Sequence, residues 1–309
     1  MPALDMPTPA ASVAVTETTV TVSGHGLITG LPVAVRLEPA TPGSGICFHL
    51  ANGAPIPARL SSVVQTDRGV TLGTDALRSG QVAPTDPNVL AQHSLSIVEH
   101  FLAACALSNR TDLNVFLSGE APELPILDGS AGPWLQALQA LAPSSPAFVA
   151  ADLRVEKPLF IRLDELTAIY ALPAESFQVT YTLDYPHPLT HCQWTRWHAE
   201  TDSAEALASA GTFGMLDELP VLQARGLARG VNLENSLGLM EDGQTTRPLR
   251  MAEEPLRHKV LDLLGDLSLL GINPLRLQAH IFAINAGHTA HIALAKQLSS
   301  KLSVIAPSR

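Results

Sequence analysis

The segment 142–146, with the sequence Ala-Pro-Ser-Ser-Pro, constrains the fold of this chain most strongly. Two prolines and two serines in five residues cannot continue a helix or a central strand, so the segment indicates a linker. We place a domain boundary at 145–152. The chain has 309 residues, which is enough for two domains of about 150 residues each. We therefore expect a disordered lead-in over 1–15, an N-terminal domain over 16–145 and a C-terminal domain over 152–309.

Apolar periodicity predicts similar elements in both parts of the chain. Alternating apolar and polar residues bounded by Gly or Pro predict strands at 16–22, 33–37, 45–50, 113–117, 159–162, 167–171, 177–185 and 277–285. Apolar residues recurring every three or four positions predict helices at 94–107, 133–141, 204–210, 255–270 and 288–301. The chain is therefore expected to be α+β, with helices layered on mostly antiparallel sheets.

Composition and charge exclude several classes of protein. Nineteen basic residues against 29 acidic ones give a net charge of −10, which leaves no basic stripe for nucleic acid or an anionic membrane. The three cysteines, Cys47, Cys105 and Cys192, are odd in number and widely spaced, which favours a reducing compartment. The N-terminus lacks the basic start of a signal peptide, and no uninterrupted apolar stretch could span a membrane. We expect a soluble cytoplasmic protein.

Polar residues within apolar helices are the candidates for chemistry. His258, Asp262 and Asp266 lie four residues apart and so share one face of the helix 255–270. A buried face of this kind needs a cation or a hydrogen-bond partner, and His with Asp at this spacing suits Zn²⁺. The alternative is a polar face turned to solvent. Glu99 and His100 form a similar pair in the helix 94–107, and the alternative there is again exposure.

A third candidate is His288, at a strand-to-helix junction, where Asp266 could hold its charge against the field of the helix start. We expect the nearby His280 and His291 to be surface or packing residues. Taken together, the candidates supply two histidines and one aspartate for a metal. They leave one glutamate and one histidine for proton transfer. Three protein ligands with an open fourth position is the pattern of catalytic zinc.

Five runs of the sequence resemble UDP-3-O-acyl-N-acetylglucosamine deacetylase, the zinc amidase of lipid A biosynthesis. They occur in the order of that family and span most of the chain: SIVEH at 96–100, PELPILDGSA at 122–131, TFG at 212–214, RHKVLDLLGD at 257–266 and GH at 287–288. The resemblance implies two α/β sandwich domains with the active site between them. It also implies hydrolysis of the N-acetyl group of the acyl-UDP-sugar, with release of acetate.

The resemblance also implies roles for individual residues. The implied metal ion is zinc, with iron(II) as the alternative, and its ligands would be His100, His258 and Asp262. Groups implied at the reacting atoms are Glu99 as base, His288 as acid, Asp266 as the partner of His288, and Thr212 at the oxyanion. Implied substrate contacts are Lys259 at the nucleotide-sugar, Tyr185 on uracil, Phe213, and Leu219 within an insert at 219–239 that cradles the acyl chain. We expect the enzyme to be a monomer whose partner is its small-molecule substrate.

The chain departs from the family pattern at several positions. Ile28 stands where the family's Gly-Leu-His-Ser-Gly run has histidine, Gly211 replaces an arginine before TFG, and Pro255 replaces an apolar residue. Arg229 and Asn232 lie in the acyl-chain insert. None of these positions is an implied metal ligand.

Two other functions remain open from the sequence. One is a zinc hydrolase of the same architecture that acts on a different acylated amine. The other is a protein that binds nucleotide-sugar or metal without catalysis, although such a protein would need neither Glu99 nor His288.

Overall fold

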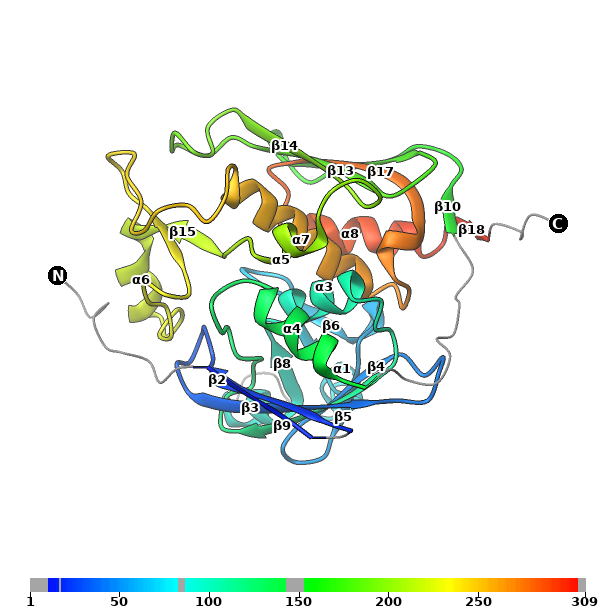
Figure 1. Cartoon of the computed structure of the whole chain (residues 1–309), viewed down its shortest axis with the longest axis vertical. Helices are drawn as coiled ribbons and strands as arrows, with labels where there is room; N and C mark the ends of the chain where they lie inside the picture. The colour runs from blue at the N-terminus through cyan, green and yellow to red at the C-terminus, as the bar shows by residue number, and fades with distance from the viewer. Residues whose placement is uncertain (1–10, 17, 83–86, 143–152, 305–309) are drawn as a thin grey trace.

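The computed structural model describes residues 11–16, 18–82, 87–142 and 153–304. The expected boundary at 145–152 and the first ten residues of the expected lead-in lie outside these ranges. The described elements form four layers, in the order sheet, helices, helices, sheet (Figure 1). We call residues 11–142 the N-terminal half and residues 153–304 the C-terminal half. Each large sheet takes its described strands from one half alone. The predicted α+β class is confirmed.

The first large sheet forms one outer layer. Its neighbouring strands are antiparallel except β4 and β9, which are parallel. In sheet order the strands are β1 (Ser12–Val15), β2 (Val20–His25), β3 (Pro32–Pro39), β9 (Leu113–Gly119), β4 (Ile46–His49) and β5 (Pro55–Pro57). Val33, Val35 and Leu37 of β3 are buried, while the residues between them are only partly buried. This alternation is the pattern that predicted the strand.

Residues 12–15 correct the predicted lead-in. They form β1, whose main chain pairs with Val20–Ser23 of β2. The pattern is hard to recognise because β1 is an edge strand and all four of its residues are exposed. The main-chain hydrogen bonds to β2, and not burial of side chains, define this strand.

The second large sheet forms the opposite outer layer. Its central strand β17 is antiparallel to β12 and parallel to both β10 and β13. The strands are β11 (Leu159–Arg162), β12 (Ala168–Pro173), β17 (Leu277–Ile284), β10 (Leu153–Val155), β18 (Leu302–Val304), β13 (Gln178–Leu183) and β14 (Gln193–His198). Both large sheets therefore mix parallel and antiparallel pairs.

Smaller elements extend each half. The N-terminal half adds a three-stranded sheet of β6 (Val63–Gln65), β7 (Thr71–Gly73) and β8 (Ser94–Ser96), with helices η1 (Leu60–Ser62), α1 (Asp75–Arg78) and α2 (Pro87–His93). The C-terminal half adds the parallel pair β15 (Phe213–Met215) and β16 (Leu237–Leu239), with helices η2 (Leu216–Glu218), α6 (Leu219–Ala224), α5 (Ala204–Ala208) and η3 (Pro274–Arg276).

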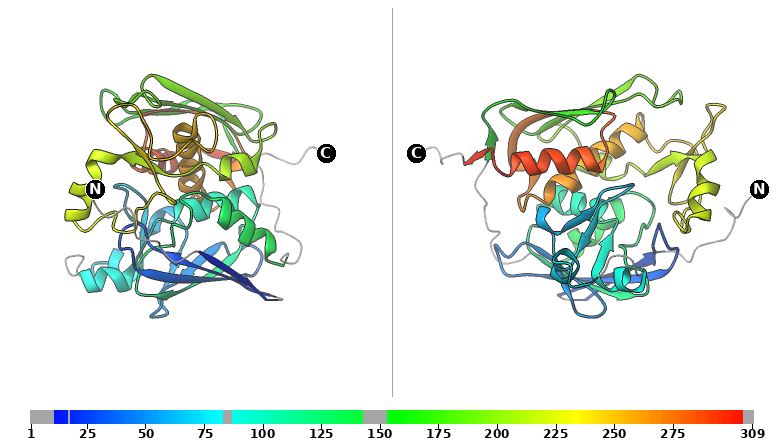
Figure 2. Two further views of the ribbon diagram at one scale, coloured as in Figure 1. Left: turned by 60° about the vertical axis from the view of Figure 1, so that its left-hand side comes forward. Right: turned by 180° about the vertical axis from the view of Figure 1, so that it is seen from behind.

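Four longer helices fill the space between the sheets. They are α3 (Glu99–Leu107), α4 (Gly132–Ala140), α7 (Glu254–Ser268) and α8 (His288–Leu298). Helix α4 contacts β2, and α8, drawn in red in Figure 2, lies against β11 and β12. Helices α3 and α7 meet in the middle and join the two halves. None of the helices in the described ranges is both long and apolar enough to cross a membrane.

The prediction of a helix over 94–107 is wrong for its first five residues. Ser94, Leu95 and Ser96 form β8, paired with β7, and α3 begins only at Glu99. Between them Ile97 takes a positive φ of 58°, which is rare for a β-branched residue. Leu95, which fitted the helical period, is buried all the same, because strand β8 also turns its side chain into the core.

The crossing of α3 and α7 depends on a glycine. A Cβ atom on Gly265 would lie 2.0 Å from the backbone oxygen of Glu99. Any side chain at position 265 would therefore push the two helices apart. This contact fixes the start of α3 against the middle of α7.

We predict that Gly265→Ala destabilises the protein by about 1–3 kcal/mol, the usual cost of overpacking. The free energy of unfolding in urea measures the effect. Gly214→Ala is the control, because a Cβ at position 214 would meet no described atom within 4 Å. Equal stability of the two variants would contradict the proposed role of Gly265.

Candidate active site

A cavity of about 1670 Å³ lies between the two halves and includes residues from both. Most of the residues that the sequence nominated line it, and Asp266 lies behind His288. The nominated residues in its wall are Glu99, His100, Tyr185, Thr212, Phe213, Leu219, His258, Lys259, Asp262 and His288. Side chains that are distant in sequence therefore meet at one place.

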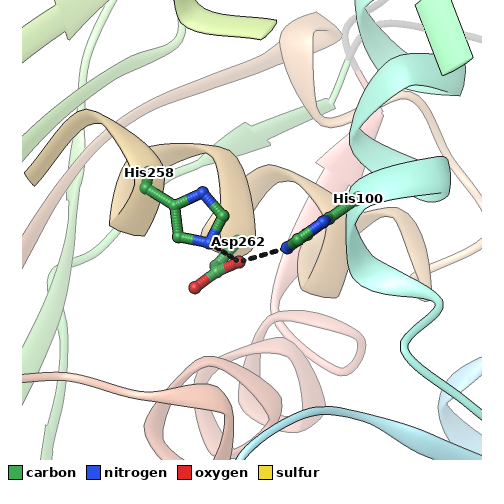
Figure 3. Close-up of side chains that lie close together, drawn as sticks. All are labelled: His100, His258 and Asp262. Carbon is green, nitrogen blue, oxygen red and sulfur yellow. Dashed lines mark ion pairs between the residues drawn. The ribbon is translucent and has the colours of Figure 1, made fainter. Parts of the chain in front are cut away.

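His100, His258 and Asp262 all line this cavity, and their side chains point toward one another (Figure 3). Oδ1 of Asp262 lies 3.6 Å from Nε2 of His100 and 3.4 Å from Nε2 of His258. One donor atom from each residue falls within a group 4.8 Å across. His100 comes from α3, and the other two come from successive turns of α7. The cluster is thus shared by the two halves.

This donor set fits a divalent metal ion. Oδ1 of Asp262 is buried and accepts no hydrogen bond from the residues that the structure describes. A buried carboxylate oxygen without a partner is costly, and a bound cation would remove this cost. Burial lowers the pKa of His258 to about 4, with help from the nearby His100 and Lys259. The carboxylate of Asp262 alone would raise this pKa. The imidazole is therefore neutral at pH 7. Its Nδ1 lies 3.0 Å from the carbonyl of Ala210, which leaves Nε2 as the ligand atom.

Lys259 belongs to the same cluster. Its Nζ donates a hydrogen bond of 2.9 Å to Oδ2 of Asp262 and lies 5.6 Å from the centre of the Phe213 ring. Burial alone would raise the pKa of Asp262, but His258 and Lys259 hold it well below the usual range of a carboxyl. The ammonium therefore keeps Asp262 ionised while lining the cavity where we expected substrate.

Glu99 is the first residue of α3 and stands beside the cluster. The backbone N–H of Val70 donates to its Oε2 at 3.2 Å, and its Oε1 lies 3.9 Å from Nε2 of His288. Burial raises the pKa of Glu99, and the nearby His288 and His100 offset this only in part. A carboxyl with a raised pKa is suited to accept and return a proton.

His288 begins α8 and is held by Asp266. Its Nδ1 donates to Oδ2 of Asp266 at 2.8 Å, so Nε2 points into the cavity, 3.9 Å from Oδ2 of Asp262. Burial would lower the pKa of His288, but Asp266, Glu99 and Asp262 together raise it to about 9. The imidazole is therefore protonated at pH 7. The pairing of His288 with Asp266 that the sequence suggested is present.

His291 is a residue of this site that the sequence analysis underrated. It is fully buried, its Nδ1 lies 2.7 Å from Oδ2 of Asp266, and its Nε2 lies 2.9 Å from the hydroxyl of Tyr181. The spacing of His288 and His291, three residues apart on one helix, could have indicated a shared face. Asp266, His288 and His291 also form a group of possible metal donors, but both Nδ1 atoms already bond Oδ2 of Asp266. We interpret this group as a hydrogen-bonded support for His288.

The departure at Ile28 lies in a turn that Glu123 holds. The buried carboxylate of Glu123 accepts the backbone N–H groups of Ile28 and Thr29, each at 2.8 Å, and the hydroxyl of Thr29 at 2.7 Å. The carbonyls of Leu27 and Ile28 in turn accept backbone N–H groups from 229–230 at 3.0 Å. The turn of the N-terminal half thereby binds the segment 219–239 of the C-terminal half.

Gly211 is the second departure from the family pattern, and side chains from elsewhere in the chain occupy the space beside it. A Cβ at position 211 would lie 2.7 Å from a guanidinium nitrogen of Arg247 and 3.1 Å from one of Arg250. Arg247 forms a two-bond pair with Glu254 at 3.0 and 2.8 Å, and Glu254 also accepts the N–H of Gly211 at 3.0 Å. Two arginines thus occupy the space beside Gly211, next to Thr212.

The third departure, Pro255, lies in the first turn of α7, where proline is well tolerated.

The rim of the cavity also joins both halves. Arg68, in the β6–β7 connection, pairs with Glu218 of η2 at 3.0 Å, and the hydroxyls of Thr66 and Thr289 lie 2.9 Å apart. Beyond this rim, α6 and the segment that follows it supply an apolar wall. Its leucines in the cavity are Leu219, Leu222, Leu227 and Leu233.

A layered α+β fold with a buried His/His/Asp cluster beside a Glu–His pair is typical of metal-assisted hydrolases. Residues 15–300 match the family described as UDP-3-O-acyl N-acetylglycosamine deacetylase. The chain belongs to this family.

Its relatives cover nearly the whole chain. A protein of Nostoc sp. (strain PCC 7120 / SAG 25.82 / UTEX 2576) is 35% identical over 285 residues, which is 89% of this chain and 94% of the relative. One of Thermosynechococcus vestitus is 34% identical over 282 residues, 90% of this chain and 91% of the relative. One of Leptospira biflexa is 32% identical over 290 residues, 93% of this chain and 89% of the relative. All three are named UDP-3-O-acyl-N-acetylglucosamine deacetylase.

We predict that Arg247→Ala destabilises the protein by about 3–5 kcal/mol, because it leaves the fully buried Glu254 without its cation. The free energy of unfolding in urea at pH 7 measures this. Arg154→Ala is the control, since both members of its pair with Glu156 are half exposed, and it should cost less than about 0.5 kcal/mol.

The effect of Arg247→Ala should depend on pH. Burial would raise the pKa of Glu254, but hydrogen bonds from Arg247 and from two backbone N–H groups lower it below 4.5. A lowered pKa stabilises the folded state above the ordinary carboxyl pKa, and this contribution is lost as the pH falls through the folded value. The stability difference between wild type and variant should therefore shrink in acid. A difference that grew in acid would contradict the pairing.

Proposed function

We propose that this protein removes the N-acetyl group of UDP-3-O-acyl-N-acetylglucosamine, releasing acetate and the free sugar amine for lipid A biosynthesis. The proposal rests on family membership and on the names of the relatives. The observation that carries it is the convergence of His100, His258 and Asp262 with Glu99 and His288 on one cavity. A protein that only binds metal or nucleotide-sugar would need neither Glu99 nor His288.

His100, His258 and Asp262 would hold the metal ion, with zinc preferred and iron(II) as the alternative. When bound, the ion supplies Lewis acidity, which polarises the acetyl carbonyl and lowers the pKa of a water molecule to about 7. Lys259 keeps Asp262 ionised and so preserves its charge for the metal.

Glu99 and His288 would divide the proton transfers between them. The carboxylate of Glu99 takes a proton from the attacking water, and its raised pKa matches this task. Nε2 of the protonated His288 faces the developing oxyanion with Thr212 and then donates its proton to the leaving amine. Asp266 is a positioning residue, because it bonds Nδ1 of His288 and leaves Nε2 as the donor.

The apolar and the aromatic residues in the cavity wall suit different parts of the substrate. The leucines of the 219–239 insert, beginning with Leu219, would enclose the acyl chain, which leaves water at a gain of about 0.8 kcal/mol per buried methylene group. Tyr185 and Phe213 present aromatic rings for the uracil and the sugar. Lys259 adds local positive charge near the diphosphate, in a chain whose net charge is negative.

An acetate-release assay with metal analysis tests the proposal. We predict that Glu99→Gln lowers kcat by roughly 10²–10⁴-fold, the usual worth of a general base, while the bound metal remains at the wild-type content. His258→Ala should lose the metal held by His100, His258 and Asp262. Glu156→Gln, in the half-exposed pair with Arg154 and outside the cavity lining, is the control and should keep both.

The same assay separates the alternatives. Acetate release from the acyl-UDP-sugar, with little from an acylated amine that lacks UDP, supports the stated substrate. The opposite preference would identify a hydrolase of another acylated amine. Metal binding with no acetate release from any substrate would overturn the catalytic role.

A second prediction concerns Asp266. Asp266→Asn should lower kcat in the wild-type background, because His288 loses the carboxylate that keeps it charged and oriented. In a His288→Gln background the same change should have almost no further effect on kcat, since residues that act as one unit are not additive. Additive losses in the double variant would show that Asp266 acts independently of His288.

A further inference from the structure

The loop between β13 and β14 carries a second cluster of potential metal donors, outside the cavity described above. Asp184, His191 and Cys192 lie at its two ends, and one donor atom from each falls within a group 4.8 Å across. All three side chains are exposed. Asp184 and Cys192 have no role in the proposed reaction.

The donor atoms face one another. Oδ1 of Asp184 lies 2.7 Å from Nδ1 of His191 and 3.4 Å from Sγ of Cys192, and Sγ lies 3.8 Å from Nε2 of His191. In a tetrahedral zinc site the ligand atoms stand about 3.3–3.6 Å apart, as follows from Zn–ligand bonds of about 2.0–2.3 Å. One imidazole nitrogen has to reach both neighbours: Nδ1 lies 2.7 Å from Oδ1 of Asp184 and 4.0 Å from Sγ of Cys192. A shift of roughly half an ångström, away from the carboxylate and toward the thiol, would therefore create the site.

The loop backbone holds this arrangement in place. The N–H of Cys192 donates to Oδ1 of Asp184 at 3.1 Å, and the N–H of Asp184 donates to Oδ1 of Asn285 at 2.7 Å. Cys192 also has a positive φ of 49°, which is uncommon for a residue other than glycine and costs free energy. The loop thus keeps a free thiol beside an imidazole and a carboxylate.

We propose that Asp184, His191 and Cys192 form a second metal site, which binds Zn²⁺ or another divalent cation with affinity for sulfur. On binding, the Cys192 thiol releases its proton to water and the sulfur forms a bond to the metal. The hydrogen bond between His191 and Asp184 opens so that each supplies one ligand atom. Because the cluster is exposed, water completes the coordination.

The position of this site connects it with the cavity. Tyr185 follows Asp184 directly and lines the cavity, as does Pro186. A metal ion on Asp184, His191 and Cys192 would join the two ends of the loop that carries these residues. The site therefore restricts the part of the cavity wall that Tyr185 forms.

Cobalt titration of the full-length protein, loaded with one equivalent of zinc and kept reduced, tests the proposal. Cobalt(II) bound to a thiolate has a charge-transfer absorption that cobalt bound to His and Asp lacks, and no described cysteine lines the cavity. We predict one equivalent of this absorption in wild type. It should disappear in Cys192→Ser, and His191→Ala should weaken cobalt binding by about tenfold or more. Cys47→Ser is the control and should keep the signal.

Each outcome bears on this site alone. Absence of the thiolate absorption in wild type, or its survival in Cys192→Ser, overturns the proposal. Loss of the signal in Cys47→Ser but not in Cys192→Ser would assign it to a different cysteine and also overturns it. Failure of the proposed deacetylation would leave the cobalt result unchanged, because the two sites share no ligand. Acetate release by Cys192→Ser should equal that of wild type at one equivalent of zinc.

Discussion

The close approach of α3 and α7 is the constraint on which the candidate site depends. One helix brings Glu99 and His100, the other brings His258, Asp262 and Asp266, and Gly265 lets them touch. A wider crossing would separate the imidazole of His100 from His258 and Asp262 by more than a metal ion can bridge. Asp262 would then keep only its neighbours on α7, His258 and Lys259. The close crossing therefore serves two purposes at once: it packs the helices together, and it brings the charged groups of the site within reach of one another.

Much of the fold could be predicted from the sequence. Strands such as β3 and β17 alternate cleanly because one face of each is buried, and α7 and α8 are long enough for the helical period to be clear. Short elements could not be predicted this way. β8 has only three residues and sits next to a helix, so its apolar residues were absorbed into the helical pattern. β1 buries no side chain at all, and main-chain pairing leaves no trace in composition.

The site shows the same limits. Spacing along one helix predicted that His258 and Asp262 share a face, but no spacing could show that His100 would come to meet them. The resemblance to a family supplied that step. His291 was missed for a different reason: a buried histidine in a packed helix resembles a core residue until its partner Asp266 is known. Likewise the sequence shows only that Gly211 replaces the family's arginine, and it could not show that Arg247 and Arg250 occupy the space beside it.

The division of the cluster between the two halves has a consequence for how this protein assembles. His100 belongs to one half, whereas His258 and Asp262 belong to the other, so neither half alone can coordinate an ion with all three groups. An ion that binds all three groups would bind only the state in which the halves are docked. Its binding free energy would therefore stabilise the docked state. Under the proposed function, loss of the ion would loosen the interface as well as stop catalysis. Chains whose halves had folded but not yet joined would not bind the proposed ion tightly, and this would couple maturation of the enzyme to completion of its tertiary structure.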